Sequence, residues 1–103
     1  MIPARLSPQA ERDLDDIGAH IAGDSPDAAQ RVRRRTLATA DFLAQYPQVG
    51  RRIRKSTPRH AQTRWFVVPK FRNYLIFYQP FQDTIIVLRI LQAAQDWTRF
   101  FPR

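Results

Sequence analysis

The chain contains no cysteine and only three glycines. Without cysteine it can form neither a disulfide nor a thiolate-bound metal site. The two histidines, His20 and His60, stand alone in the sequence, and neither has a second ligand at helix or strand spacing. No glycine-rich phosphate loop occurs, and no nucleophile-elbow or Ser-His-Asp pattern. We therefore expect no metal site and no cofactor.

Long apolar runs are also missing. The best one, Thr84–Leu91, is interrupted by Arg89 and is too short to span a bilayer. The N-terminal residues 1–5 lack the apolar region of a signal peptide. We therefore expect a soluble, cytoplasmic protein that has no membrane partner.

Acidic residues are scarce beside basic ones. The chain has 9 Asp and Glu against 17 Lys and Arg, which gives a formal net charge of +8. Such an excess favours an anionic partner, either a nucleic acid or an acidic protein. With 103 residues, 44% of them hydrophobic, the chain is long enough for one packed core, so residues 1–103 are predicted to form a single domain.

The apolar pattern is strongest between Gln62 and Ala94, where it predicts three strands. The two links between them are too short for a crossover helix, so neighbouring strands must run antiparallel. The predicted strands are Gln62–Val68, Asn73–Gln79 and Thr84–Leu91.

Both faces of this predicted sheet are apolar. In the last strand, strict alternation places Ile86, Leu88 and Ile90 on one face, and Ile85, Val87, Arg89 and Leu91 on the other. One face should pack on the helices of the chain. The second face, which carries Arg64, Tyr78 and Arg89, is either covered by the C-terminal tail or is a binding surface.

The first half of the chain predicts a short strand, Ile2–Leu6, and then a helix. Ser7 offers an N-cap hydroxyl and Pro8 a first helical residue. The helix should run to about Ala22, because its apolar residues recur at spacings of four, three and four. These residues are Ala10, Leu14, Ile17 and Ile21.

A second helix is predicted from Pro26 to Gln45, because Ser25 and Pro26 repeat the same start signal. The link between the helices is very short, so they should form an antiparallel hairpin. The element order is therefore β-α-α-β-β-β. This order predicts an α+β fold in which a two-helix hairpin packs on one face of a mostly antiparallel four-stranded sheet.

Positive charge is densest in the segment after the second helix, which we expect to be a loop. Its cations are candidates for contact with phosphate or an acidic partner, and the alternative is a solvated loop. They are Arg51, Arg52, Arg54, Lys55 and Arg59. We expect a solvated face for three cations that lie off the apolar stripe of the second helix. They are Arg31, Arg34 and Arg35.

Three segments together resemble the ParE/RelE superfamily of bacterial toxins from type II toxin–antitoxin modules, and the ParE branch most of all. They are Leu6–Ile17, Ser25–Ala29 continued by Leu43–Arg51, and Tyr74–Tyr78 followed by Ile86–Trp97. The match covers nearly the whole chain, in order and with the right spacing. It implies a toxin neutralised in a hetero-oligomer by an acidic antitoxin encoded beside it, either ParD-like or another DNA-binding antitoxin.

The resemblance implies two possible targets. ParE-like members inhibit DNA gyrase, whereas RelE-like members cleave mRNA on the ribosome. Metal-free RNA cleavage needs a group that activates the ribose 2′-OH, cations on the phosphate and an acid for the leaving oxygen. The superfamily's ribonucleases place Arg, Lys, His or Tyr after the last strand, where this chain has Gln92, Gln95 and Asp96. Gln92 stands where ParE-like sequences often have His, and Gln95 where they often have Arg.

The main interpretation is therefore a gyrase inhibitor that is not an enzyme. The candidates for target contact are Arg89, Gln92, Gln95, Asp96 and Trp97. One alternative is a ribosome-dependent endoribonuclease that uses Arg64, Tyr78 and Arg89. Another is a decayed toxin that only binds its antitoxin. In each case we expect the antitoxin's carboxylates to meet the basic loop, and its apolar residues to meet the sheet or the helical hairpin.

The tail after the last strand is unusually aromatic. Trp97, Phe100 and Phe101 fall on one side of a predicted short helix. Such a side must dock, either on the second face of the sheet or on a partner.

Overall fold

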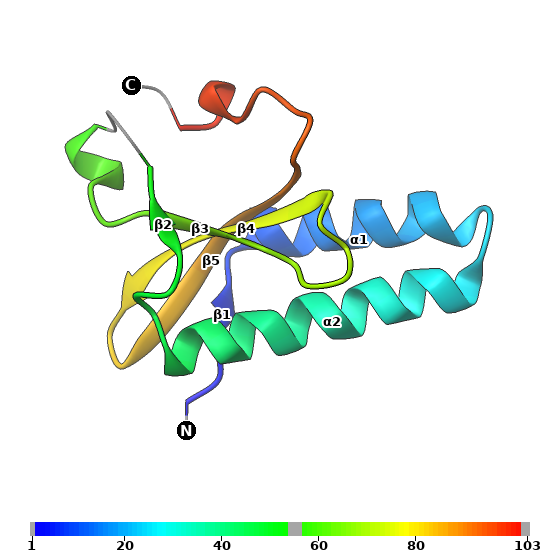
Figure 1. The fold of residues 1–103 in the computed structure, drawn as a ribbon, viewed down its shortest axis with the longest axis horizontal. Helices are drawn as coiled ribbons and strands as arrows, with labels where there is room; N and C mark the ends of the chain where they lie inside the picture. Colours follow the sequence, from blue (N-terminus) through cyan, green and yellow to red (C-terminus); the bar gives the residue numbers. More distant parts are fainter. Residues whose placement is uncertain (1, 54–56, 102–103) are drawn as a thin grey trace.

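A computed structural model describes residues 2–53 and 57–101 and shows two antiparallel helices on one face of a twisted sheet (Figure 1). The elements in chain order are β1 (Arg5–Leu6), α1 (Pro8–Ala22), α2 (Pro26–Gln45), β2 (Arg51–Arg52), β3 (Arg64–Val67), β4 (Tyr74–Phe81) and β5 (Thr84–Gln92), with 3-10 turns at Pro58–His60 and Trp97–Arg99. The predicted α+β class and the hairpin of helices are confirmed.

Both helices begin at the predicted residues because serine caps fix them. The Ser7 hydroxyl accepts a hydrogen bond from the Ala10 N–H at 3.0 Å, and the Ser25 hydroxyl accepts one from the Ala28 N–H at 3.1 Å. The Ser7 hydroxyl also donates to the Leu88 carbonyl oxygen at 2.9 Å, which joins the start of α1 to β5. Among the described residues, no helix combines the length and the apolar character needed to cross a bilayer.

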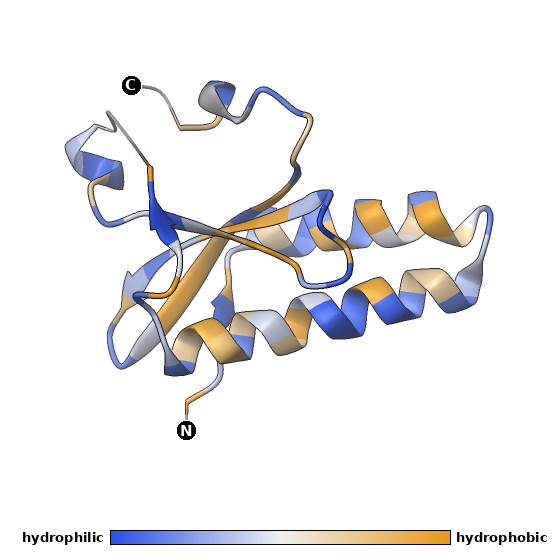
Figure 2. Cartoon of the chain, in the orientation of Figure 1, coloured by the Kyte–Doolittle hydropathy of each residue, from blue (hydrophilic) through white to orange (hydrophobic). Residues whose placement is uncertain are grey.

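The apolar stripe of α1 faces the sheet, as predicted. Ala10 and Leu14 are buried, and Ile17 and Ile21 pack as half-buried residues against the same core. The core continues through α2 and the facing side of β4 and β5, where apolar residues dominate the ribbon (Figure 2). Its buried members from these three elements include Val32, Ala40, Leu43, Tyr74, Ile76, Tyr78, Ile85, Val87 and Ile90.

The sheet has five strands, in the order β1-β5-β4-β3-β2, where four were predicted. β1 runs parallel to β5, and the other pairs are antiparallel. The additional strand is β2, which pairs Arg51 with Trp65 and Arg52 with Arg64. The prediction of a loop here was wrong, because two paired arginines give no alternating apolar pattern to detect.

A β-bulge breaks the expected alternation in β5. Phe77 pairs with Arg89 and Tyr78 pairs with Val87, so Leu88 is the extra residue. Beyond the bulge, Ile90 lies with Ile85 and Val87 in the core against the helices, while Leu88 and Leu91 pack on the opposite face. The predicted grouping of Ile86, Leu88 and Ile90 on one face was therefore wrong. The predicted placement of Tyr78 on the second face was also wrong, because Tyr78 lies in the core against the helices.

The C-terminal tail covers the second face of the sheet. Phe101 is 2% exposed, and its ring stacks on that of Phe77 with 4.7 Å between centroids. Trp97 and Phe100 pack as half-buried residues on the same cluster, and Ile53 closes it from the other side. Of the two possibilities left open by the sequence, the tail is the correct one. The expectation of an antitoxin on this sheet face therefore loses its basis.

Candidate functional site

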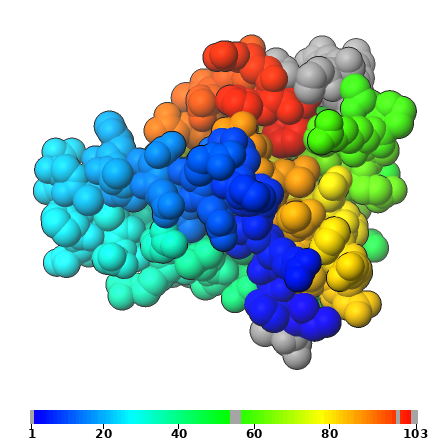
Figure 3. All heavy atoms as spheres, turned by 180° about the vertical axis from the view of Figure 1, so that it is seen from behind, coloured from blue at the N-terminus to red at the C-terminus, as the bar shows by residue number. Residues whose placement is uncertain are grey.

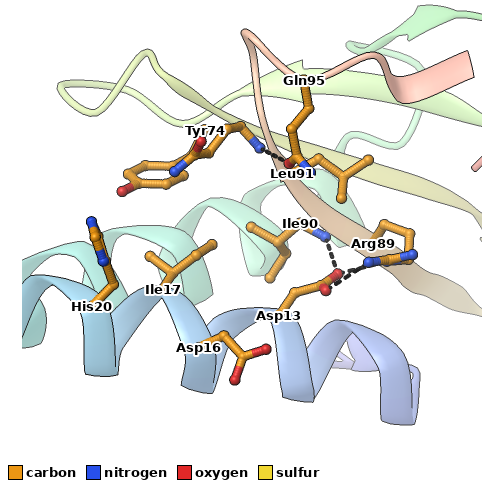
Figure 4. Close-up of a pocket in the computed structure, with 10 residues that line it drawn as sticks. Asp13, Asp16, Ile17, His20, Tyr74, Arg89, Ile90, Leu91 and Gln95 are labelled. Carbon is orange, nitrogen blue, oxygen red and sulfur yellow. Dashed lines mark hydrogen bonds and ion pairs between the residues drawn. The ribbon is translucent and has the colours of Figure 1, made fainter. Parts of the chain in front are cut away.

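A groove of about 400 Å³ lies between α1, the end of β5 and the segment that follows it (Figure 4). We call it the α1 groove. The space-filling view shows α1 beside the orange-to-red C-terminal segment (Figure 3). The groove brings together three of the predicted target-contact residues, Arg89, Gln92 and Gln95. Its other polar lining residues are Asp13, Asp16, His20 and Tyr74.

Arg89 is held at the base of this groove by Asp13 of α1. Its Nε donates to Asp13 Oδ2 at 2.7 Å and its Nη2 donates to Asp13 Oδ1 at 2.8 Å. The Ile90 N–H also donates to Asp13 Oδ2, at 3.0 Å. On its other side the Arg89 guanidinium carbon lies 4.3 Å from the centroid of the Phe100 ring. The charge of Arg89 is therefore neutralised and its position is fixed.

Gln92 and Gln95 form the rim of the groove, and both are exposed. The Gln92 N–H donates to the Gln95 side-chain oxygen at 3.0 Å, and the Gln95 N–H donates to the Gln92 carbonyl oxygen at 3.0 Å. These bonds close a tight turn that presents two neutral amides. An amide side chain can donate and accept hydrogen bonds but carries no charge.

The remaining two predicted target-contact residues do not line the groove. Trp97 is half-buried against the sheet, with its ring centroid 5.8 Å from that of Phe77. Asp96 is exposed at the start of the last turn, where its backbone carbonyl oxygen accepts from the Arg99 N–H. The five predicted residues are therefore divided between the groove and the packed tail.

The other two ribonuclease candidates, Arg64 and Tyr78, pair across β3 and β4 and hold the loop after α2. The buried Tyr78 hydroxyl donates to the Pro47 carbonyl oxygen at 2.8 Å and accepts from the Gly50 N–H at 2.9 Å. Arg64 Nη1 donates to the Gly50 carbonyl oxygen at 2.7 Å. Arg89 instead reaches Asp13, so the three candidates contact separate parts of the fold.

This loop needs a glycine at position 50 because other groups approach so closely. A Cβ there would lie 2.9 Å from the Trp65 carbonyl oxygen and nearer still to the Tyr78 hydroxyl. Burial raises the pKa of Tyr78 above its ordinary value of 10.0, against the opposing effects of the Gly50 hydrogen bond and the Arg64 charge. Tyr78 therefore stays protonated near neutral pH.

Of the predicted antitoxin-binding cations, the structure describes Arg51 and Arg52, which form the edge strand β2, and Arg59. Arg51 and Arg52 are exposed, and the Arg51 guanidinium carbon is 5.9 Å from the Trp65 ring centroid. Arg59 is exposed in the first 3-10 turn. Arg54 and Lys55 lie outside the described residues.

His60 follows Arg59 and is half-buried under the tail. Its Nδ1 lies 3.1 Å from the Thr63 hydroxyl, and its ring centroid is 5.0 Å from that of Phe101. Burial, with a smaller contribution from Arg59, lowers the pKa of His60 below its ordinary value of 6.5. Within the described residues, no group of three or more His, Asp or Glu side chains is arranged to hold a metal ion.

Asp13 is the site residue that sequence reasoning missed. A carboxylate in the first half of a helix is favourable for the helix dipole, and this alone accounts for an aspartate at position 13 in the sequence. The contact with Arg89 spans 76 positions, and neither α1 nor β5 carries a local pattern that indicates it.

Comparisons with known proteins give toxins named ParE and toxins named RelE. A family model described as the ParE toxin of the type II toxin–antitoxin system parDE matches residues 4–97. Y4kP of Sinorhizobium fredii, named as a toxin, is 39% identical over 90% of each chain. Toxin RelE2 of Caulobacter vibrioides is 37% identical over 84% of this chain and 90% of its own length. Toxin RelE3 of the same species is 28% identical over 92% and 98%.

A solved structure from the chromosomal ParDE system of P. aeruginosa has the same fold. It superposes with a TM-score of 0.71 at 19% sequence identity, and the match covers 89% of this chain and 96% of that one. The ParE resemblance inferred from the three sequence segments is thus confirmed by the family model over most of the chain. The chain belongs to the ParE toxin family of type II toxin–antitoxin systems.

Proposed function

We propose that this toxin acts by inhibiting DNA gyrase and that an acidic antitoxin neutralises it. One observation supports a non-nucleolytic action: the side chains of Arg64, Tyr78 and Arg89 form hydrogen bonds with other groups of the fold. The hydrogen-bonding groups of Arg64 and Tyr78 hold the Pro47–Gly50 loop, and those of Arg89 hold Asp13.

These contacts oppose the chemistry of RNA cleavage. A cation that stabilises a developing phosphorane aims preorganised donors at the phosphate, whereas Arg64 and Arg89 aim donors at groups of the fold. A tyrosine that accepts the ribose 2′-OH proton near neutral pH needs a lowered pKa, and the pKa of Tyr78 is raised by burial. Gln92 and Gln95, which occupy the rim of the α1 groove, carry no charge and do not transfer protons in this pH range.

We propose that the target contacts the rim of the α1 groove and the segment Gln92–Trp97. The exposed amides on this rim supply donors and acceptors, and the Arg89–Asp13 pair keeps the rim rigid. A preorganised surface of this kind loses little conformational entropy when it binds a partner.

The proposal is tested with purified toxin in a gyrase supercoiling assay and, separately, with translating ribosomes and a defined mRNA. We expect supercoiling to be inhibited and the message to stay intact. Gln92→Ala should weaken inhibition roughly tenfold if Gln92 is a hot spot of the interface, because truncating a hot-spot residue costs more than about 1 kcal/mol. Asp83→Asn, in the distant β4–β5 turn, is the matched control and should inhibit as the wild type does.

Trp97→Ala is the second variant, and its interpretation needs a stability measurement. Because Trp97 packs on Phe77, this change should lower the melting temperature as well as any target binding. Codon-linked cleavage of the message with normal supercoiling would contradict the proposal and favour the RelE-like ribonuclease. Arg64, Tyr78 and Arg89 are then the residues to substitute.

A further inference from the structure

A second groove runs along the opposite helix of the hairpin, between α2 and the end of β3 with the turn that follows. It consists of two adjoining hollows of about 380 and 310 Å³, and we call it the α2 groove. Arg35 and Ala38 line both hollows, so the two are continuous. The first hollow adds Arg31, Arg34, Lys70 and Phe71. The second adds Thr39, Phe42, Phe66 and Pro69.

The α2 side of the groove is a single face of the helix. Arg31, Arg34 or Arg35, Ala38 and Phe42 follow one another at spacings of three or four residues. From Arg31 to Phe42 this face is roughly 16 Å long at 1.5 Å per residue. Most cations of the α2 groove therefore lie toward one end, and Phe42 and Phe66 lie toward the other, where Arg35 is the one cation among the described lining residues. The groove is long enough for about three turns of a docked helix.

The cations of the groove have no acidic partner among the described residues. The ion pairs found there join Arg33 to Asp15 and Arg89 to Asp13, and neither involves a residue of the α2 groove. Asp41 is an acidic residue of α2, but its Oδ1 accepts a hydrogen bond from the Ala4 N–H at 3.1 Å. Ala4 immediately precedes β1. Like charges are thus gathered along one face, and an anionic partner would relieve their repulsion.

Lys70 gives an independent sign that charge matters here. It occupies the third position of a turn closed by a 3.1 Å hydrogen bond from the Phe71 N–H to the Val68 carbonyl oxygen. Its φ is +70°, and Pro69 precedes it, as in a type II turn. Glycine or asparagine is the residue favoured at that position. The chain instead keeps a cation at the mouth of the groove in a strained backbone conformation.

The aromatic end of the groove is open to solvent. Phe42 is 42% exposed, although its ring centroid lies 6.0 Å from that of Phe66. Tyr46, one helical turn further on, is 52% exposed and stands 5.3 Å from Phe42. A patch of exposed aromatic rings next to unpaired cations is typical of an interaction surface.

We propose that the α2 groove binds an acidic amphipathic segment of the antitoxin. The segment's carboxylates meet Arg31, Arg34 and Lys70, and its apolar side chains meet Phe42 and Phe66. This inference rests on the proposed function, in which an antitoxin exists. The sequence-based expectation placed the antitoxin's carboxylates on the basic loop and its apolar residues on the sheet or the helical hairpin, and it assigned Arg31, Arg34 and Arg35 to a solvated face. Here, instead, both kinds of contact lie in the α2 groove.

The division of the groove into a cationic and an aromatic end favours a peptide over a nucleic acid. A phosphate backbone carries charge at every nucleotide and is matched by cations along the whole path. An amphipathic helix presents apolar anchors and carboxylates in separate places, as this groove requires.

Ala38 allows the sharpest test because it is exposed and lines both hollows. Glutamate is a good helix former, so Ala38→Glu should fold, yet it places a negative charge at the centre of the groove. The probe is the protein encoded in the reading frame beside the toxin gene, purified and titrated against the toxin. We expect Ala38→Glu to weaken binding on the order of 100-fold, because like charges at an interface repel strongly. Ala38→Gln, equal in size and neutral, should weaken it less than about fivefold.

Lys70→Gly is a second test that separates binding from folding. It removes the cation and relieves the positive φ, so we expect affinity to fall about 3- to 10-fold while the melting temperature does not fall by more than about 3 °C. Gln82→Gly is the matched control. Gln82 also has a positive φ, of +54°, but lies in the β4–β5 turn away from the groove, so its affinity should equal that of the wild type.

Two results would overturn the proposal while the antitoxin still binds the wild type. One is equal affinity of Ala38→Glu and wild type, and the other is equal weakening by Ala38→Glu and Ala38→Gln. In the first case, loss of antitoxin binding by the double variant Arg52→Gln/Arg59→Gln would place the antitoxin on the basic loop. A generic 20-base-pair DNA duplex is titrated in parallel. The proposal is also overturned if Ala38→Glu and Lys70→Gly weaken binding of this duplex but not of the antitoxin. If the wild type binds no antitoxin at all, the proposed function fails as well.

Discussion

The α1 and α2 grooves flank the same helical hairpin, and they use charge in opposite ways. In the α1 groove, Arg89 is bonded to Asp13 and stacked on Phe100, so its charge serves the fold. In the α2 groove, Arg31, Arg34 and Lys70 have no ion-pair partner among the described residues. The comparison shows that a net charge of +8 does not describe one uniform surface. A cation is available to a partner only where the fold does not already use it.

The largest expected effect tests whether the Asp13–Arg89 pair belongs to the fold. Asp13→Ala should lower the free energy of unfolding by about 3–5 kcal/mol, because it leaves the Arg89 charge and the Ile90 N–H without a buried partner. Denaturant unfolding measures this. Asp16→Ala, on the exposed side of the same helix and on the rim of the same groove, should change stability by less than about 0.5 kcal/mol. Equal effects of the two substitutions would remove the contrast between the grooves.

The second prediction concerns the loop held by Tyr78. Tyr78→Phe should destabilise the protein by about 1–3 kcal/mol, because the Gly50 N–H and the Pro47 carbonyl oxygen lose a buried hydrogen-bond partner. Tyr46→Phe, at an exposed ring, is the control and should be nearly neutral. If Tyr78→Phe were as stable as the wild type and had lost an mRNA cleavage activity that the wild type shows, Tyr78 would instead have a catalytic role.

Arg33 sharpens the comparison within one helix. It lies between Arg31 and Arg34 in the sequence, but it bonds Asp15 of α1 at 3.1 Å and does not line the α2 groove. Both partners are largely exposed, so Arg33→Gln should cost about 0–1 kcal/mol of stability. It should leave antitoxin affinity unchanged, whereas Arg34→Gln weakens it. Equal loss of affinity in the two variants would mean that net charge, not the groove, recruits the antitoxin.

The smallest expected effect is a pH dependence from His60. Because its folded pKa lies below 6.5, the unfolded chain binds more protons than the folded chain between these two values. Stability should therefore be full above about pH 6.5 and fall as the pH drops toward the lowered pKa. His60→Gln should remove this slope in melting experiments between about pH 7.5 and 5. An unchanged slope would assign the acid sensitivity to other groups.

Most of the fold follows from local signals in the sequence. Ser7 and Ser25 set the helix starts, and alternation of apolar residues sets β3, β4 and β5. The missed features depend on contacts between distant parts of the chain. β2 exists because Arg51 meets Trp65, and the bulge at Leu88 re-aims the end of β5.

The candidate sites were less predictable for the same reason. Three of the five predicted target-contact residues, Arg89, Gln92 and Gln95, lie together in the α1 groove because they are neighbours along the chain. Asp96 and Trp97 do not line it. The sequence did not reveal Asp13, and it did not join Lys70 to the arginines of α2, because those contacts cross between elements. Lys70 carries no sequence signal beyond Pro69, since its strain becomes visible only in the backbone angle.

The most direct test of two separate grooves is to measure Ala38→Glu and Gln92→Ala in both the antitoxin titration and the gyrase supercoiling assay. We predict that Ala38→Glu loses antitoxin affinity on the order of 100-fold and still inhibits supercoiling as the wild type does. Gln92→Ala should bind the antitoxin normally and inhibit supercoiling roughly tenfold less. If each variant instead lost both activities to the same extent, the two grooves would form a single functional surface, and this account would be wrong.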